Sequence, residues 1–175
     1  ERWPRDKPCG DSQAEVTMSH VRELGGFDEV KKVGFPNKGL LLSAPNHEKC
    51  YLPAKGERFT TPRRIFDNIV KELAVRHGAE LLEECWVYDV IKEDGFVKGV
   101  RAKYQGEYVE FRSKLVIGAD GSHSRVAKAI DQFPDDPLSV AVVGRCYYEY
   151  VPMEGYLEIH FDQNVLPGYV WVFPS

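Results

Sequence analysis

The chain has 175 residues, of which 43% are hydrophobic and 29% charged, and its formal net charge is −4. That balance is typical of a folded globular protein and excludes a disordered one, and an acidic surface repels nucleic acid phosphates, so we expect no nucleic acid partner. No apolar run approaches the ~20 residues that a membrane-spanning helix needs, and the four cysteines form no Cys-x-x-Cys pair.

The start of the chain predicts a helix followed by a pair of strands. Apolar residues recur at helical spacing over Gln13–Leu24, after Ser12 and Glu15, which form a Ser-x-x-Glu capping box. Two short apolar segments, Gly39–Ser43 and Lys49–Leu52, are then typical of strands joined by a turn.

A longer helix and a β-meander are predicted next. Thr61 is a candidate N-cap, and the broad apolar stripe that follows it stops at Gly78. Three strands with tight turns between them are predicted at Leu81–Ile91, Phe96–Tyr104 and Tyr108–Phe111.

The remainder of the chain predicts one buried strand, one helix and a second sheet. Leu115–Ile117 is a short, continuously apolar segment, typical of a strand inside a parallel sheet, and a helix is expected at His123–Ile130. Proline and aspartate residues at 134–137 indicate a linker. Further strands are predicted at Val140–Val151, Tyr156–Phe161 and Tyr169–Phe173.

The turn between Leu115–Ile117 and the following helix carries the strongest chemical signal. Gly118 and Gly121 allow backbone to approach a ligand closely, and the helix start offers N–H groups that suit phosphate. Asp120 stands at the carboxyl end of the strand, where it can accept hydrogen bonds from hydroxyls or amides. The plain alternative is that Asp120 and Ser122 only cap the helix.

This segment resembles the Gly-Ala-Asp-Gly-x-x-Ser-x-Val-Arg motif of FAD-dependent monooxygenases and their relatives, with Ala127 in place of the final Arg. The resemblance implies that Asp120 contributes to the binding of both FAD and NAD(P)H. It makes Gly118, Gly121 and Ser124 further cofactor-binding candidates.

A Lys-Pro-Cys-Gly segment near the start resembles the geranylgeranyl reductase family of FAD-dependent oxidoreductases. The resemblance gives Glu1 the role of holding the adenosine ribose and places Cys9 beside the flavin ring as the catalytic residue. Lys7 would lower the pKa of that thiol, and Arg2, Lys7 and Gly10 are further candidate cofactor contacts. Without the resemblance, Cys9 would be interpreted as an ordinary small buried residue.

No Gly-x-Gly-x-x-Gly occurs in the chain. The resemblance therefore predicts that the first strand and phosphate loop of the dinucleotide fold lie upstream, and that the chain is an internal fragment.

Three aromatic residues near the end of the chain alternate, so that a strand would place them on one face: Tyr169, Trp171 and Phe173. They resemble the Tyr-x-Trp-x-Phe-Pro motif of geranylgeranyl reductases, which implies a substrate-binding wall suited to an isoprenoid chain. Alternation by itself fits an ordinary half-buried strand equally well.

Arg63 opens an Arg-x-x-Phe-Asp segment that is similar to one in the same flavoproteins, and it is a further cofactor-binding candidate. A cation at a helix start suggests a ligand or an acidic neighbour, although a solvated arginine fits as well. The histidines show no metal-binding spacing, so no metal site is predicted.

Together these features predict an α/β chain: part of a three-layer FAD/NAD(P)-binding domain with a β-meander, plus an antiparallel substrate-domain sheet. Residues 1–136 are assigned to the partial FAD-binding domain, with an interleaved substrate-domain segment at about 37–60. Residues 137–175 are assigned to the truncated start of the substrate-binding sheet.

The resemblance implies an FAD-dependent oxidoreductase that reduces carbon–carbon double bonds of a geranylgeranyl-type isoprenoid or a related apolar substrate. Hydride would come from reduced flavin, with NAD(P)H or a ferredoxin-like protein as the electron donor. The scattered cysteines favour reduced thiols and hence a cytoplasmic location, and a lipid substrate would add peripheral membrane contact. The alternatives are an FAD-dependent monooxygenase or halogenase of an aromatic substrate, and a fragment without activity of its own; the oligomeric state is left open.

Overall fold

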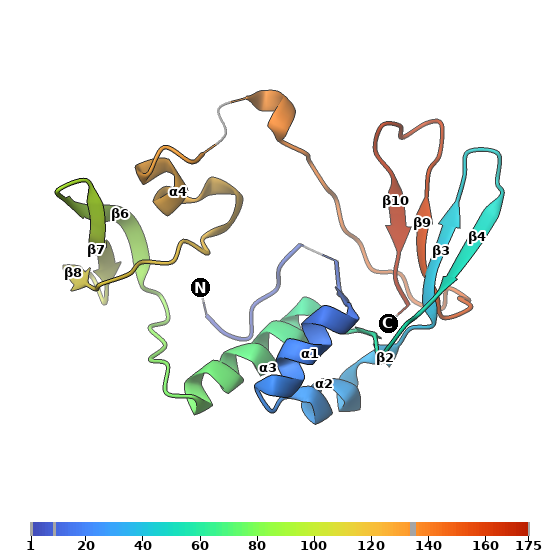
Figure 1. Cartoon of the computed structure of the whole chain (residues 1–175), viewed down its shortest axis with the longest axis horizontal. Helices are drawn as coiled ribbons and strands as arrows, with labels where there is room; N and C mark the ends of the chain where they lie inside the picture. Colours follow the sequence, from blue (N-terminus) through green and yellow to red (C-terminus); the bar gives the residue numbers. More distant parts are fainter. Residues whose placement is uncertain (1, 9, 134–135, 175) are drawn as a thin grey trace. The chain divides into compact units, whose positions relative to one another are not determined.

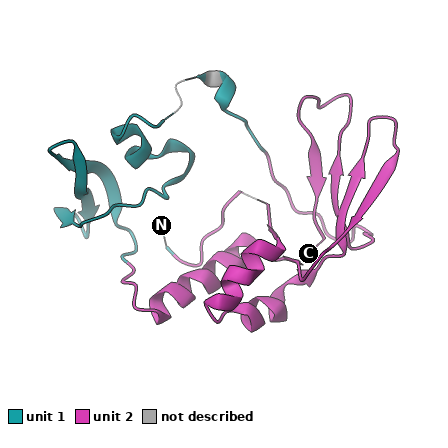
Figure 2. Cartoon of the chain, in the orientation of Figure 1, with its two compact units in different colours: residues 1–2, 82–143 teal, residues 3–81, 144–175 magenta. Residues whose placement is uncertain are grey.

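The computed structural model describes residues 2–8, 10–133 and 136–174. The chain divides into two units (Figure 2). Unit 1 comprises Glu1–Arg2 and Leu82–Val143, and unit 2 comprises Trp3–Leu81 and Gly144–Ser175. Both units mix strands with helices or turns of helix, which confirms the predicted α/β class.

Three helices form the helical part of unit 2: α1 (Glu15–Glu23), α2 (Phe27–Val33) and α3 (Arg63–Arg76), shown together in Figure 1. Their core consists of Met18, Val21, Val30 and Phe59, with Phe27, Phe66 and Ile69 packed against it. The first and third helices were predicted. The sequence analysis missed α2, because its seven residues span too short a stretch to show helical periodicity.

The capping box predicted for α1 is wrong. Ser12 lies in strand β1 (Ser12–Gln13), which pairs with β5 (Phe59–Thr60); β5 in turn pairs with β2 (Phe35–Pro36). A residue held in a strand cannot also cap the helix, and Ala14 takes the N-cap position without a side-chain hydrogen bond.

The start of α3 lies one residue later than predicted. Pro62 is its N-cap, and Thr61 instead donates its backbone N–H to the carbonyl of Asp11 at 2.8 Å. The predicted end is confirmed, because His77 is the C-cap and Gly78 adopts a left-handed conformation with φ of +91°.

A four-stranded sheet in unit 2 has the order β10-β9-β3-β4 (Figure 1). Its strands are β3 (Gly39–Ser43), β4 (Lys49–Pro53), β9 (Leu157–His160) and β10 (Val170–Val172), all within predicted segments or one residue of them. The sheet is mixed rather than wholly antiparallel, since β3 and β9 run parallel. Parallel pairing is possible because a long stretch of chain connects these two strands.

The strand predicted at Val140–Val151 is wrong. Its described residues form no ladder with another segment; the side chains of Val142 and Tyr150 are 96% and 97% exposed. The segment is rich in apolar and aromatic residues, but a strand also needs a partner whose backbone groups pair with its own. The predicted linker at 134–137 lies partly outside the described residues.

Unit 1 contains the predicted meander. Strands β6 (Trp86–Glu93), β7 (Phe96–Tyr104) and β8 (Glu107–Arg112) pair in sequence order, while the predicted extension at 81–85 is not a strand. Asp94 and Gly95 both have positive φ in the first turn, as a tight two-residue hairpin requires.

The strand predicted at Leu115–Ile117 is also wrong. Leu115 is 74% exposed and Ile117 is 81% exposed, and among the described residues no strand pairs with them. A short apolar segment becomes a buried strand only when neighbouring strands flank it. The helix after it, α4 (Arg125–Ala129), is shorter than predicted and follows a single 3₁₀ turn at Gly121–His123; another such turn lies at Pro137–Ser139.

Over the part of the chain that the structure describes, no helix combines the length and apolar character that crossing a bilayer would require.

Candidate functional site

The turn that carries Asp120 is held together by its own hydrogen bonds. One carboxylate oxygen accepts the hydroxyl of Ser124, and the other accepts the backbone N–H of Arg125 at 2.7 Å and of Val126 at 3.4 Å. Ser124 in turn caps α4, because its Oγ accepts the backbone N–H of Ala127 at 3.0 Å. The hydrogen bond from Ser124, followed by those from the backbone, lowers the pKa of Asp120, so this carboxylate is ionised at neutral pH.

These bonds change the interpretation of the helix start. The sequence analysis expected free N–H groups for phosphate, but the first three N–H groups of α4 already have acceptors in Asp120 and Ser124. A contact with a cofactor would therefore use the remaining lone pairs of the Asp120 carboxylate or the backbone on either side. The plain alternative, capping by Asp120 and Ser122, holds for Asp120 but not for Ser122, whose Oγ instead lies 3.2 Å from His123 Nδ1.

Glycine is needed in this turn for two separate reasons. A Cβ at Gly118 would lie 2.7 Å from Cβ of Val126, so the backbone at Gly118 and the helix could not approach as they do. Gly121 has a φ of +79°, which disfavours other residues. Arg125 then ties the helix to the meander, since its Nη1 donates to the Tyr88 carbonyl at 3.0 Å and its guanidinium lies over the ring of Trp86.

A second cluster lies in unit 2 and is centred on Asp11, which is only 4% exposed. Its Oδ1 accepts the backbone N–H of Arg63 at 3.0 Å, and its Oδ2 accepts the hydroxyl of Tyr147 at 2.8 Å. Arg145 Nη1 lies 3.6 Å from Oδ1. The Asp11 carboxylate therefore caps α3, where negative charge is favourable, from a distant part of the sequence.

Arg145 fixes the segment before Asp11 as well. Its Nη2 donates to both carboxylate oxygens of Asp6 at 2.8 and 2.7 Å, and its Nη1 donates to the Lys7 carbonyl at 2.8 Å. The hydrogen bond from Arg145 is the main cause of the lowered pKa of Asp6. The Lys-Pro-Cys-Gly segment is thus anchored at both ends, by Asp6 before it and by Asp11 after it.

Arg63 has the acidic neighbour that its position suggested. Its Nε and Nη2 donate to the two oxygens of Asp67 at 2.6 and 2.8 Å, and Arg5 Nη2 lies 3.3 Å from Oδ2. Asp67 is 8% exposed, so this bidentate pair is largely shielded from water. Arg63 and Arg5 thus share the one carboxylate of Asp67, which favours a role in holding the chain; binding of cofactor by Arg63 stays a prediction.

An aromatic row lies along β10 and ends at Gly10. The ring centroids of Tyr169 and Trp171 are 5.3 Å apart, and those of Trp171 and Phe173 are 6.2 Å apart. A Cβ at Gly10 would lie 2.9 Å from Cε2 of Phe173, so the backbone can pack on this ring only because the residue is glycine. Two motifs recognised separately in the sequence, Lys-Pro-Cys-Gly and Tyr-x-Trp-x-Phe-Pro, therefore meet in unit 2.

The remaining predicted site residues are not brought into either cluster. Glu1 and Cys9 lie outside the described residues, so their roles and their convergence with Asp120 stay predictions. Arg2 forms an exposed ion pair with Glu84, with Nε and Oε1 2.9 Å apart. Lys7 is exposed, and its backbone rather than its ammonium makes the contact with Arg145. In the described ranges, no three His, Cys, Asp or Glu side chains gather in a metal-binding arrangement.

The sequence analysis missed three residues that build the unit 2 cluster: Asp11, Arg145 and Tyr147. Asp11 gave no signal beyond its place after the Lys-Pro-Cys-Gly segment. Arg145 and Tyr147 fell within the wrongly predicted strand, and their partners lie 139 and 136 positions away. No local pattern could have revealed these pairs.

Comparison with known proteins then identifies the family. The model of the FAD binding domain family matches residues 1–140. The chain belongs to this family. This match confirms the predicted FAD cofactor and the predicted three-layer FAD/NAD(P)-binding fold. The curated relatives confirm the predicted relationship to geranylgeranyl reductases.

One curated relative of this FAD-binding domain is the digeranylgeranylglycerophospholipid reductase of Methanosarcina acetivorans, which is 33% identical over 146 residues. The match covers 79% of this chain but only 36% of the relative's length. A geranylgeranyl bacteriochlorophyll reductase-like protein from Thermoplasma acidophilum has a similar fold, with a TM-score of 0.71 at 19% identity over 99% of this chain and 46% of that one. The myxobacterial chondrochloren halogenase CndH also has a similar fold, with a TM-score of 0.78 at 22% identity. The match covers 99% of this chain and 43% of the halogenase chain.

The residues of the FAD-binding domain fit this cofactor. The ionised carboxylate of Asp120 is suited to hydroxyl and N–H donors of FAD, beside the backbone of Gly121, where no atom lies within 4 Å of the place a Cβ would take. We assign these residues as the candidates that would hold FAD.

Proposed function

We propose that the protein is an FAD-dependent reductase of carbon–carbon double bonds in an isoprenoid lipid. The observation that carries this proposal is the packing of Gly10 on Phe173, because it joins the segment of the candidate catalytic cysteine to an apolar aromatic face. Such a face binds a hydrocarbon chain in preference to a polar substrate. The name of the Methanosarcina acetivorans relative, a reductase of a digeranylgeranyl lipid, supports the same substrate class.

Each group has a distinct part in the proposed reaction. The flavin, once reduced by the electron donor, would supply the hydride that one alkene carbon accepts, and a proton added to the other carbon would complete the reduction. Tyr169, Trp171 and Phe173 bind the chain and exclude water from it. Cys9 is the proposed catalytic residue at the reacting carbons, and the ion pairs of Asp6 and Asp11 orient its segment.

The proposal extends to the surroundings of the enzyme. NAD(P)H or a ferredoxin-like protein is the proposed electron donor. A lipid substrate implies peripheral contact with a membrane from a cytoplasmic location. The division into an FAD-binding part at 1–136, with an interleaved segment at about 37–60, and a substrate sheet at 137–175 stays a prediction.

Anaerobic turnover tests the proposed function. The purified flavoprotein, reduced without oxygen and given a geranylgeranyl lipid, is expected to add two hydrogens for each double bond, measured by mass spectrometry of the product. Cys9→Ala is expected to slow turnover about 100-fold or more, as loss of a positioned proton donor does. Cys85→Ala is the matched control, because Cys85 belongs to unit 1 and to neither motif, and it should leave the rate unchanged.

The opposite result would identify one of the alternative activities. If the protein modified its substrate only in the presence of oxygen, by hydroxylation or halogenation, the reductase proposal would be wrong. This alternative has a basis in similarity, since the 1H-pyrrole-2-carbonyl-[peptidyl-carrier protein] brominase of Pseudoalteromonas luteoviolacea is 31% identical over 110 residues.

A further inference from the structure

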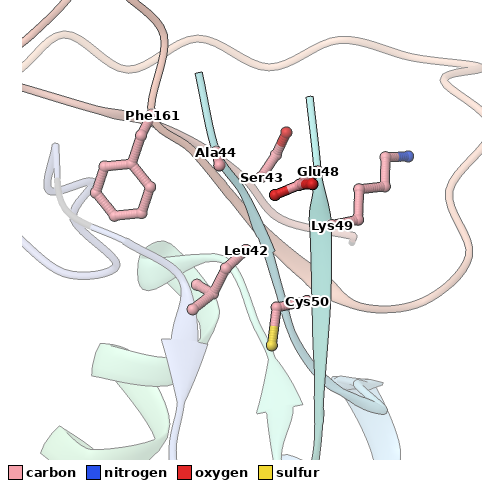
Figure 3. Close-up of a pocket in the computed structure, with 7 residues that line it drawn as sticks. All are labelled: Leu42, Ser43, Ala44, Glu48, Lys49, Cys50 and Phe161. Carbon is pink, nitrogen blue, oxygen red and sulfur yellow. The ribbon is translucent and has the colours of Figure 1, made fainter. Parts of the chain in front are cut away.

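The sheet that carries the aromatic row also contains a pocket, located near the turn between β3 and β4. It has a volume of about 340 Å³ and is shown in Figure 3. We call it the terminal pocket; its lining residues are Leu42, Ser43, Ala44, Glu48, Lys49, Cys50 and Phe161. The volume falls within the ~300–1,000 Å³ range of ligand pockets.

Strand register places the apolar walls of the terminal pocket on the same face of the sheet as the aromatic row. Leu42 pairs with Cys50 on one side and with Ile159 on the other, and Ile159 pairs with Trp171. Directly paired residues project to the same face, so these four side chains form one row across all four strands. Figure 3 shows Leu42 and Phe161 on one side of the two strands and Lys49 directed to the other.

Phe161 connects the aromatic row to the terminal pocket. Its ring centroid lies 6.0 Å from that of Tyr169, and its side chain also lines the pocket. A continuous apolar path thus runs from Phe173, beside Gly10, along β10 to Tyr169 and then through Phe161 to the pocket.

We propose that the terminal pocket binds the distal end of the substrate's isoprenoid chain and thereby selects chain length. This inference rests on the proposed function. The path begins at the segment of the candidate catalytic cysteine, so a chain with its reacting bond there extends along the aromatic row. Neighbouring ring centroids from Phe173 to Phe161 are 5.3 to 6.2 Å apart, about the length of one isoprene unit. Only a chain of several units therefore reaches the pocket.

The walls of the terminal pocket favour a hydrocarbon end over a polar head group. Leu42, Ala44, Cys50 and Phe161 supply apolar or weakly polar surface, while the ammonium of Lys49 points away. A phosphate head group at this place would meet the carboxylate of Glu48, which repels it, whereas a methyl-branched chain end gains by leaving water. The head group is therefore expected at the opposite end of the path.

Cys50→Trp tests the inference, because an indole at position 50 would fill the pocket. In the purified flavoprotein this variant is expected to lower kcat/KM for a geranylgeranyl substrate at least about 10-fold, as loss of an apolar pocket does, while kcat/KM for a geranyl substrate stays unchanged. Tyr51→Trp is the matched control. Tyr51 is the next residue of β4 but pairs with Leu41 and projects to the other face, so this variant should behave as wild type with both chains.

Alkylation of Cys50 provides a second measurement that does not depend on turnover or on any variant. Cys50 is exposed, so a maleimide should label it in the wild-type protein, quantified by peptide mass spectrometry. Geranylgeraniol is expected to slow this labelling, and geraniol to leave it unchanged. Equal protection by both alcohols, or by neither, would overturn the inference, as would a Cys50→Trp variant that loses activity with both chain lengths alike. Failure of wild-type protein to reduce any isoprenoid would instead overturn the proposed function.

Discussion

Asp11 and Asp120 occupy equivalent local positions but are built in different ways. Each accepts the backbone N–H of the first residue of a helix, Arg63 in α3 and Arg125 in α4. The partners of Asp120 lie four to six positions along the chain, and its carboxylate is exposed. The hydrogen-bond donors to the Asp11 side chain lie 52 and 136 positions away, and the residue is almost fully buried.

The Asp120 turn is formed by residues close together in sequence, whereas the Asp11 cluster forms only when distant parts of unit 2 fold together. The Asp120 turn needs little beyond its glycines and Ser124, so it can present an ionised carboxylate wherever the chain places it. The Asp11 cluster exists only when the start of the chain, α3 and the segment at 145–147 are all in place. The cluster holds the chain before the Lys-Pro-Cys-Gly segment through Asp6 and after it through Asp11.

The largest effect is expected for Asp11→Ala. Removing this carboxylate leaves the Tyr147 hydroxyl, the Arg63 N–H and the Arg145 guanidinium without their shared acceptor in a buried place. Breaking such a buried pair costs about 3–5 kcal/mol of unfolding free energy. Urea denaturation followed by circular dichroism measures the loss.

Asp11→Asn is the control for shape and charge. The amide keeps one oxygen that can accept the Arg63 N–H, so we expect a smaller loss than with alanine. If alanine cost no more than asparagine, the Asp11 cluster would be as tolerant as an exposed turn, and the contrast between the two aspartates would fail.

A smaller effect is expected for Asp120→Ala. Its hydrogen bonds are those of an exposed helix cap, whose loss costs about 0.5–2 kcal/mol. The folded pKa of Asp120 is lowered from 3.8, so its stabilising contribution is present above that pH and disappears as the pH falls through the lower folded value. The stability difference between wild type and variant should therefore shrink on acidification.

Ser122→Ala separates the two possible caps of this turn. Ser122 makes no contact with the N–H groups of α4, so its removal should leave stability unchanged. A loss equal to that of Asp120→Ala would show that Ser122 caps the helix after all, as the plain interpretation of the sequence allowed.

Local signals account for what the sequence predicted well. The apolar stripe of α3, the paired turns of the meander and the alternation around Trp171 each depend on residues a few positions apart. The Lys-Pro-Cys-Gly and Tyr-x-Trp-x-Phe-Pro motifs were recognised in the same way. Their packing at Gly10 and Phe173 was not predicted, because it depends on how two distant segments fold together.

The failures share a physical cause. Leu115–Ile117 and Val140–Val151 have the composition of strands, but composition does not supply a hydrogen-bonding partner. The Ser12 capping box lost to pairing with Thr60, a tertiary contact that overrides a local preference. Arg145 and Tyr147 were missed because their function in the fold is defined only by Asp6 and Asp11, far away in sequence.

The smallest loss of stability is expected from ionisation of Tyr147, and it tests how accessible the Asp11 cluster is to water. Burial around its hydroxyl, followed by the hydrogen bond to Asp11, raises the pKa of Tyr147 from 10.0 to about 12. The native state favours the protonated phenol, so the contribution to stability is complete below pH 10.0 and is lost as the pH rises through about 12. Because 54% of the residue remains exposed, solvent screens the interaction and the loss should be slight. Phenolate absorbance of wild type minus Tyr147→Phe should show one group ionising near pH 12; ionisation near pH 10.0 would mean that water reaches Asp11 as freely as it reaches Asp120.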